Sequence, residues 1–278
     1  MIRRIAWLNE KGGSGKSTSA LNVAANLAKL KRRTLLLDLD HQGNSTAVLT
    51  QGQPVGASLA QVLVGEIPAA DALYHTRYAN LDLLPASAEL ADVNIALADP
   101  TGKLGRGREL RLKRALTDLE QRYDYVIADT GPQRTLLNVN VLNYVHEVFV
   151  PIDPGYFSLL GVQRLEQLIN DIREMMDHPQ LHIGGILLTR VTSTNVAREV
   201  EAQVRAAFGE RVFRTTIPQS IKVEEAHSRG MSVLDYAPNS TGALAYLTLT
   251  EEIIAYERRT PQEDGTRQPA PAADHPAV

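Results

Sequence analysis

The residues best suited to chemistry lie near the start of the chain, in a glycine-rich segment that contains two lysines. Residues 11–18 read Lys-Gly-Gly-Ser-Gly-Lys-Ser-Thr. Glycines allow the backbone N–H groups to turn toward an anion, and a helix that starts directly after them adds the positive end of its dipole. A lysine and a hydroxyl at the end of such a loop can bind nucleotide phosphates and magnesium. The predicted phosphate-binding residues are therefore Lys11, Gly12, Gly13, Ser14, Gly15, Lys16, Ser17 and Thr18.

The loop departs from the usual phosphate-binding pattern at its start. The usual pattern has a glycine five positions before Gly15, where this chain has Glu10, and Lys11 follows at once. A second lysine can add positive charge to a phosphate cluster, either in its own subunit or in a neighbouring one. The alternative for Lys11 is an ordinary solvated lysine.

Two carboxylates are placed to complete such a site. Asp40 follows the apolar run at residues 34–38, and it could orient a water molecule for in-line attack on a phosphate. Asp129 ends a second apolar run, at residues 125–129, which is the arrangement that holds magnesium directly or through water. Because Asp38 lies so close to Asp40, one of the two could instead cap a helix or a turn. We expect catalysis to depend on Lys11, Lys16 and Asp40, and magnesium to be held by Ser17, Asp40 and Asp129.

The spacing of apolar residues predicts the elements that position these groups. Residues 4–8 and 34–38 read as buried strands, and residues 17–31 between them as an amphipathic helix. Further strands are predicted at 125–129, 148–152 and 183–189, and further helices at 109–121, 161–176 and 241–258. This alternation predicts an α/β fold, a mostly parallel twisted sheet with helices on both faces. The carboxyl ends of neighbouring strands in such a sheet share one crevice, where ligands bind.

The composition is that of an ordinary globular protein and excludes several kinds of site. The chain has 278 residues, of which 44% are hydrophobic and 22% charged, with a net charge of −3. It contains no cysteine, which excludes disulfides, thiolate metal sites and a cysteine-held iron–sulfur cluster. The sequence shows no signal peptide and no run of about 20 apolar residues, so we expect a cytoplasmic protein with no membrane partner.

Taken together, these segments resemble the ParA/MinD group of P-loop ATPases. The Lys-Gly-Gly loop looks like the deviant Walker A motif of that group, residues 37–44 look like its second motif, and Asp129 fits its third. Further likenesses lie at residues 150–156, 185–189 and 216–226, so the resemblance extends over about residues 2–257. We place a P-loop ATPase domain at residues 1–259 and a disordered tail rich in Pro and Ala at residues 260–278.

The resemblance implies a slow, partner-stimulated ATPase that uses ATP and Mg²⁺ and forms a homodimer in the ATP state. By this likeness, Lys11 would reach the partner's phosphates and Lys16 would bind those of its own subunit. Ser17 would ligate magnesium, and Asp40 would position the hydrolytic water. ParA members in the ATP state bind DNA without sequence preference, and a ParB-like activator releases them. That cycle partitions chromosomes, plasmids or other cargo, and it implies association with a bacterial or archaeal nucleoid.

The segments that would contact DNA depart from the family pattern. Gln219 stands where many DNA-binding members carry arginine, although Lys222 matches a basic position. Elsewhere His41 and Gly131 stand at usual proline positions, and Asp153 replaces a usual glutamine. Ordinary solvated surface is the alternative for each candidate DNA contact, as it is for the basic stretch at residues 103–114. The candidates are Arg190, Arg198, Arg205, Lys222 and Arg229.

Two other functions remain open from the sequence. One is a MinD-like positioning ATPase that acts on a membrane or a protein scaffold instead of DNA. Its membrane form is disfavoured because the last predicted helix carries Glu251 and Glu252 and lacks a basic amphipathic face. The other is a binding module without hydrolysis, against which Lys16, Ser17 and Asp40 argue.

Overall fold

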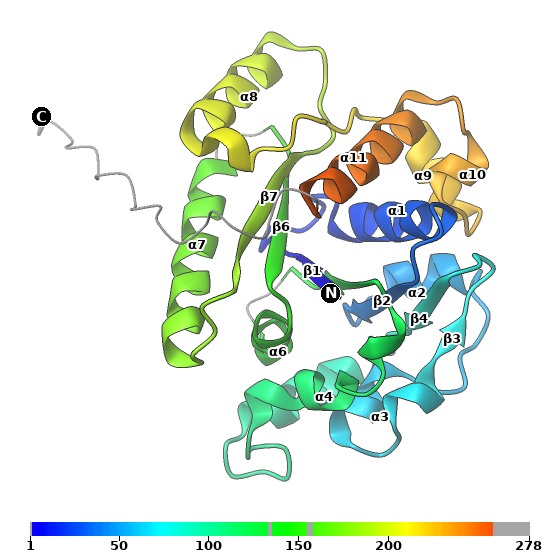
Figure 1. Ribbon diagram of the computed structural model, residues 1–278, viewed down its shortest axis with the longest axis vertical. Helices are drawn as coiled ribbons and strands as arrows, with labels where there is room; N and C mark the ends of the chain where they lie inside the picture. Colours follow the sequence, from blue (N-terminus) through cyan, green and yellow to red (C-terminus); the bar gives the residue numbers. More distant parts are fainter. Residues whose placement is uncertain (1, 133–134, 155–157, 258–278) are drawn as a thin grey trace, which may run out of the picture.

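One mostly parallel sheet forms the centre of the molecule. The computed structural model describes residues 2–132, 135–154 and 158–257. Within this part of the chain, seven strands pair in the order β3–β4–β2–β5–β1–β6–β7 (Figure 1). Each pair is parallel except β3 with β4. The strands are β1 (Arg3–Trp7), β2 (Thr34–Leu39), β3 (Tyr74–His75), β4 (Leu81–Leu84), β5 (Tyr125–Thr130), β6 (Glu147–Ile152) and β7 (His182–Leu188). The α/β fold predicted from the sequence is therefore confirmed.

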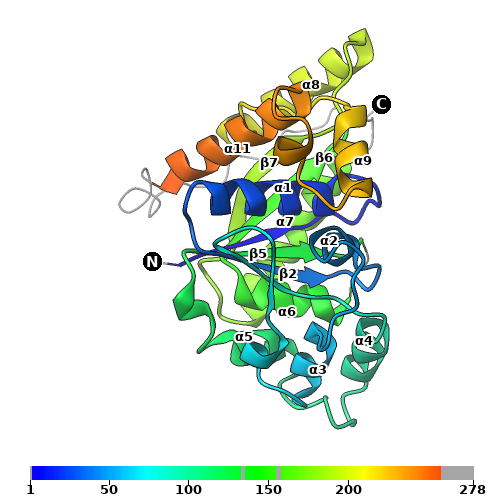
Figure 2. The ribbon, with the colours of Figure 1, turned by 90° about the vertical axis from the view of Figure 1, so that its right-hand side faces the viewer.

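Helices cover both faces of the sheet, as Figure 2 shows. Helices α1, α9 and α11 pack on one face, and α3 to α7 pack on the other. The helices are α1 (Lys16–Lys29), α2 (Asn44–Leu49), α3 (Leu59–Val64), α4 (Leu90–Ala98), α5 (Arg111–Leu116), α6 (Leu136–Tyr144), α7 (Ser158–Met175), α8 (Asn195–Phe208), α9 (Ile221–Ser228), α10 (Val233–Tyr236) and α11 (Thr241–Glu257).

The alternation of side chains along the central strands builds two apolar cores. In β2, Leu35 and Leu37 join the core beneath α3 to α7, whereas Leu36 joins the core beneath α1 and α11. All three are fully buried, which is why this strand reads as a continuous apolar run. Trp7 and Phe149 meet edge to face on the α1 side, with 5.3 Å between ring centroids. This packing holds in place the carboxyl ends of the central strands, where the glycine-rich loop, Asp40 and Asp129 lie.

The helix predicted at residues 109–121 is wrong as a single element. The segment forms a 3-10 turn at Arg108–Leu110, then α5, then a second 3-10 turn at Glu120–Arg122. Asn140 of α6 causes the first break, because its amide accepts from the Leu112 N–H at 3.2 Å and donates to the Arg108 carbonyl at 2.7 Å. A continuous helix would use those backbone groups internally, so a tertiary contact overrides the local pattern.

Two further expectations concern the ends of the chain and the membrane. The tail predicted at residues 260–278 lies outside the described residues. Of the helices in the described ranges, none is both long and apolar enough to span a bilayer.

Candidate nucleotide site

The glycine-rich loop joins β1 to α1 at the carboxyl edge of the sheet. Gly13 and Gly15 take φ of 71° and 90°, a left-handed backbone region that glycine enters without steric cost. Because β1 pairs with β5, the loop sits beside the strand that carries Asp129, and β2, which leads into Asp40, is the next strand beyond β5. The predicted residues that line a cavity of about 860 Å³ next to this loop are Gly12, Gly13, Gly15, Lys16, Ser17, Thr18 and Asp40. A cavity of this size suits a nucleotide.

Lys16 is the buried cation of this cavity. Only 6% of the residue is exposed, and its ammonium donates to the Lys11 carbonyl at 3.2 Å. Burial lowers the pKa of Lys16, while the nearby carboxylates of Asp129 and Asp40 act in the opposite direction. The charge of Lys16 therefore lies near Asp40, Asp129 and the glycine-rich loop, the three groups that the sequence predicted to come together. Because the residue is buried, water screens this charge poorly.

Asp129 has one carboxylate oxygen that fits a metal ion. Its Oδ2 accepts from the Ser45 hydroxyl at 2.7 Å, whereas its buried Oδ1 has no hydrogen-bond partner among the described residues. Burial and the charge of Asp38 raise the pKa of Asp129, while the hydroxyls of Ser45 and Ser17 lower it. A cation near Ser17 would satisfy the orphaned oxygen directly or through water.

This donor set is small, and that suits magnesium bound together with phosphates. No group of three or more His, Asp or Glu side chains that could hold a metal occurs among the residues the structure describes. Magnesium keeps several waters and takes one or two protein ligands plus substrate phosphates, so a full protein cage is not required.

The structure assigns different places to Asp38, which lies within β2, and Asp40, which directly follows it. Asp38 is fully buried, and its Oδ2 accepts from both the backbone N–H and the hydroxyl of Thr46, each at 2.7 Å. It thus fixes the start of α2. Asp40 lines the cavity, and its Oδ1 accepts from the Gln42 N–H at 3.0 Å. Asp40 is therefore the aspartate placed where it could orient a water molecule.

Two of the departures from the family pattern lie against Asp40. The Nδ1 of His41 is 3.6 Å from the Asp40 Oδ1, and the Gln42 amide holds the other ring nitrogen of His41 at 2.8 Å. At Gly131, a Cβ would lie 3.6 Å from the Asp40 carboxylate. Both departures therefore lie in the immediate surroundings of the carboxylate that is expected to orient the water.

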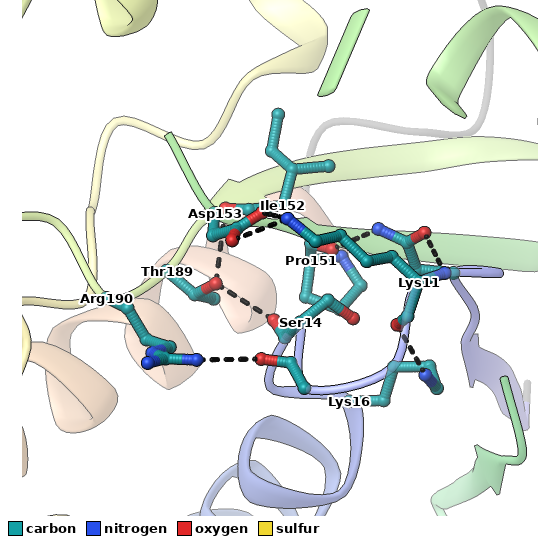
Figure 3. A network of polar contacts seen from close by, with 10 residues as sticks. Lys11, Ser14, Lys16, Pro151, Ile152, Asp153, Thr189 and Arg190 are labelled. Atoms are coloured by element: carbon teal, nitrogen blue, oxygen red, sulfur yellow. Dashed lines mark hydrogen bonds and ion pairs between the residues drawn. The ribbon is translucent and has the colours of Figure 1, made fainter. Parts of the chain in front are cut away.

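Lys11 points away from the cavity and pairs with another departure from the family pattern. Its ammonium lies 2.8 Å from each carboxylate oxygen of Asp153, just beyond β6 (Figure 3). The Lys11 side chain is 59% exposed, and Lys11 is not among the cavity-lining residues. In the single subunit, Lys11 is therefore bound by Asp153 and does not face the cavity of its own chain.

The candidate DNA contacts are distributed over three elements, and several are engaged internally. On α8, Arg205 binds Glu201 and the carbonyls of Phe213 and Arg214, and Arg198 binds the Asn195 side chain. On α9, Lys222 pairs with Glu225 at 2.7 Å, and Arg229 follows the helix as an exposed residue. Arg190, two residues after the end of β7, lies instead against the glycine-rich loop.

Two of the six cations in the basic stretch at residues 103–114 are engaged internally, and the other four are exposed. Arg108 donates to the carbonyls of Leu97 and Ala98, and Arg111 donates to those of Leu63, Lys103 and Leu104. Leu112 is fully buried. For Arg108 and Arg111 these contacts favour a packed helix surface over a phosphate-tracking face.

The opposite wall of the cavity was missed by sequence reasoning. It consists of residues 217–220 together with Val223, Glu224 and His227 of α9 and Tyr246 of α11. Asn22 ties this wall to α1, since its amide donates to the Thr18 carbonyl at 2.8 Å and lies 3.4 Å from the His227 ring nitrogen. The contact between Asn22 and His227 joins residues 205 positions apart, and no local pattern signals it.

Comparisons with known proteins agree with this geometry. Residues 2–183 match the AAA domain family. The chain is 40% identical over 255 residues to the chromosome-partitioning ATPase Soj of Thermus thermophilus, covering 91% of this chain and 96% of that protein. It is 38% identical over 261 residues to the chromosome partitioning protein ParA of Caulobacter vibrioides, covering 92% and 96%. The solved structure of cobyrinic acid a,c-diamide synthase from Mycobacterium smegmatis, with bound ATP analog and magnesium, has a TM-score of 0.80 and 30% identity, covering 93% of this chain and 96% of that one.

Proposed function

This chain belongs to the Soj/ParA family of partitioning ATPases, and we propose that it is a Mg²⁺-dependent ATP switch that dimerises with ATP and partitions DNA or other cargo. The observation that carries the proposal is the placement of Lys16, a buried cation among Asp40, Asp129 and the glycine-rich loop. The proposed ATPase domain covers residues 1–259.

Different residues in and beside the cavity would carry out the different parts of ATP binding and hydrolysis. The loop N–H groups and Lys16 would bind the phosphates, and the Ser17 hydroxyl and Asp129 would hold Mg²⁺. Bound Mg²⁺ would offset the negative charge of the phosphate oxygens. Asp40 would orient the attacking water and accept its hydrogen bond. Turnover is expected to be slow, with a ParB-like partner accelerating it.

We propose that the ATP-bound form of this protein binds DNA. Support comes from the names of the partitioning relatives and from three exposed cations, Arg198 on α8 and Lys222 and Arg229 on and after α9. Binding of this kind needs only several cations on one face and carries no sequence preference. Two subunits present twice as many cations as one, so dimerisation would strengthen DNA binding.

Lys11 is the residue through which we propose that ATP joins two subunits. It would reach the nucleotide phosphates of a partner chain, which requires it to leave Asp153. The Lys11–Asp153 pair is largely solvated, and such pairs contribute about 1 kcal/mol or less. Phosphates carry more negative charge than one carboxylate, so the exchange is favourable.

Two substitutions test this dimer in opposite directions. Lys11→Ala is expected to abolish dimerisation by a non-hydrolysable ATP analogue with Mg²⁺, because the cross-subunit contact is lost. Asp153→Asn removes the competing carboxylate and is expected to tighten the dimer by up to about five-fold. Light scattering across a concentration series, with the ATP analogue and with ADP, measures both effects.

The same experiment can refute the assignment. A Lys11→Ala protein that dimerises like the parent would show that Lys11 does not bridge subunits. An Asp153→Asn dimer weaker than the parent's would show that Asp153 supports the interface instead of competing for Lys11.

A further inference from the structure

Arg190 belongs to the nucleotide site, although the sequence suggested it as a DNA contact. We propose that Arg190 is a positioning residue, which holds the peptide planes of the glycine-rich loop so that their N–H groups face the nucleotide phosphates. The inference rests on the proposed function only in that the cavity binds a nucleotide.

The backbone of Arg190 is the first observation. Its φ is 54°, in the left-handed region that side chains other than glycine, Asn and Asp rarely adopt. Its neighbours are pinned on both sides, since the Thr189 N–H donates to the Ile152 carbonyl at 2.8 Å and the Val191 N–H donates to the Ile217 carbonyl at 3.0 Å. The chain therefore leaves its pairing with β6 at Arg190 and turns to the wall of the cavity. Strained residues of this kind persist where the surroundings fix them, and they cluster at functional sites.

The side chain is the second observation. The Arg190 Nη1 donates to the Gly13 carbonyl at 3.3 Å. The neighbouring Thr189 hydroxyl shares its one proton between the Ser14 carbonyl at 2.9 Å and the Ile152 carbonyl at 3.1 Å (Figure 3). Two successive carbonyls of the loop are thus bound from the end of β7. In a trans peptide the carbonyl of one residue and the N–H of the next point in opposite directions. The N–H groups of Ser14 and Gly15 are therefore turned away from β7.

The position of the guanidinium is the third observation. Arg190 is exposed and lines the cavity together with Thr189, Pro218 and Gln219. Its charge therefore faces the same space as Lys16, where it favours an anionic ligand. A residue that served only to turn the chain would be better as glycine, which adopts this φ at no steric cost. What arginine adds at this position is its reach to Gly13.

Arg190→Gly separates these roles. Glycine suits the backbone, so the thermal midpoint should stay the same or rise, while the contact with Gly13 and the charge are lost. We expect the Kd for ATP and for ADP to rise about ten-fold. Turnover at saturating ATP should fall by a smaller factor than the affinity does, because Arg190 contacts the loop at Gly13 and the attacking water is assigned to Asp40. Arg190→Lys, which keeps the charge and a donor, should recover most of the affinity.

The measurement is equilibrium binding of fluorescent ATP and ADP analogues with Mg²⁺, beside a thermal unfolding curve and DNA retention at saturating nucleotide. An Arg190→Gly protein with the parent's nucleotide affinity overturns the inference, and a loss confined to DNA retention returns Arg190 to the DNA surface. If the parent binds neither ATP nor ADP, the proposed function fails and this inference with it. If the parent binds and Arg190→Gly matches it, only this inference fails.

Discussion

Replacing Asp40 with alanine is expected to lower ATP turnover by about a hundred-fold or more while leaving ATP binding close to that of the parent. Asp40 lines the cavity beside Lys16 but is oriented toward Gln42 and His41 rather than the glycine-rich loop. It can therefore act on the attacking water without holding the phosphates, and positioned proton acceptors contribute about 10²–10⁴-fold. Phosphate release at saturating ATP measures the rate, and titration with a fluorescent ATP analogue measures the binding.

Asp40→Asn is the matched control, because it keeps the shape of the side chain and removes its charge. It should lose turnover nearly as fully as Asp40→Ala does, and both proteins should remain dimeric with ATP. Turnover at the parent's rate in Asp40→Ala would show that another group orients the water, and the role assigned to Asp40 would be wrong.

Replacing Lys16 with alanine is expected to raise the Kd for ATP by about a hundred-fold or more. The lysine is buried, so its charge acts on bound phosphates with little screening, and charge-assisted hydrogen bonds of this kind are among the strong ones. Hydrolysis and ATP-dependent dimerisation should then be lost together. Isothermal titration with ATP and Mg²⁺ measures the affinity, and an unfolding curve shows whether the fold tolerates the change.

Lys11→Ala is the natural comparison for Lys16→Ala, since both remove a lysine of one loop. Lys11 is exposed and lies outside the cavity lining, so its loss should leave nucleotide binding by the single subunit intact. Equal losses of affinity in the two variants would contradict the division of roles between the lysines.

The chemistry of the site was readable from the sequence because it depends on local patterns. Glycine spacing predicted a loop that needs left-handed residues, and Gly13 and Gly15 adopt that backbone. Parallel strands bring their carboxyl ends to one edge of the sheet. That rule predicted from the sequence alone that Asp40 and Asp129 lie near the loop. Both strands are buried along their whole length and contain a short apolar run before the aspartate, and that run allowed them to be predicted.

Contacts between residues far apart in the chain could not be predicted from the sequence. The pairing of Lys11 with Asp153 joins residues 142 positions apart, and the contact between Arg190 and Gly13 spans 177. Charge alone put Arg190 with the DNA contacts, because a positive φ at an arginine has no local signature. In the same way Asn140 interrupts the predicted helix at residues 109–121 from a different element. The distinction between Asp38 and Asp40 depended on the contacts of Asp38 with Thr46.

The central claim, that ATP switches this chain onto DNA, is tested most directly with the Asp40→Ala protein, which should hold the ATP state. Its retention on random-sequence duplex DNA would be measured with ATP–Mg²⁺ and with ADP–Mg²⁺ across a salt series. The account predicts retention with ATP and little with ADP, with the ATP-dependent binding weakening steeply as salt rises, because phosphate contacts release counterions. Equal retention in the two nucleotide states, or none in either while the ATP dimer forms, would contradict it.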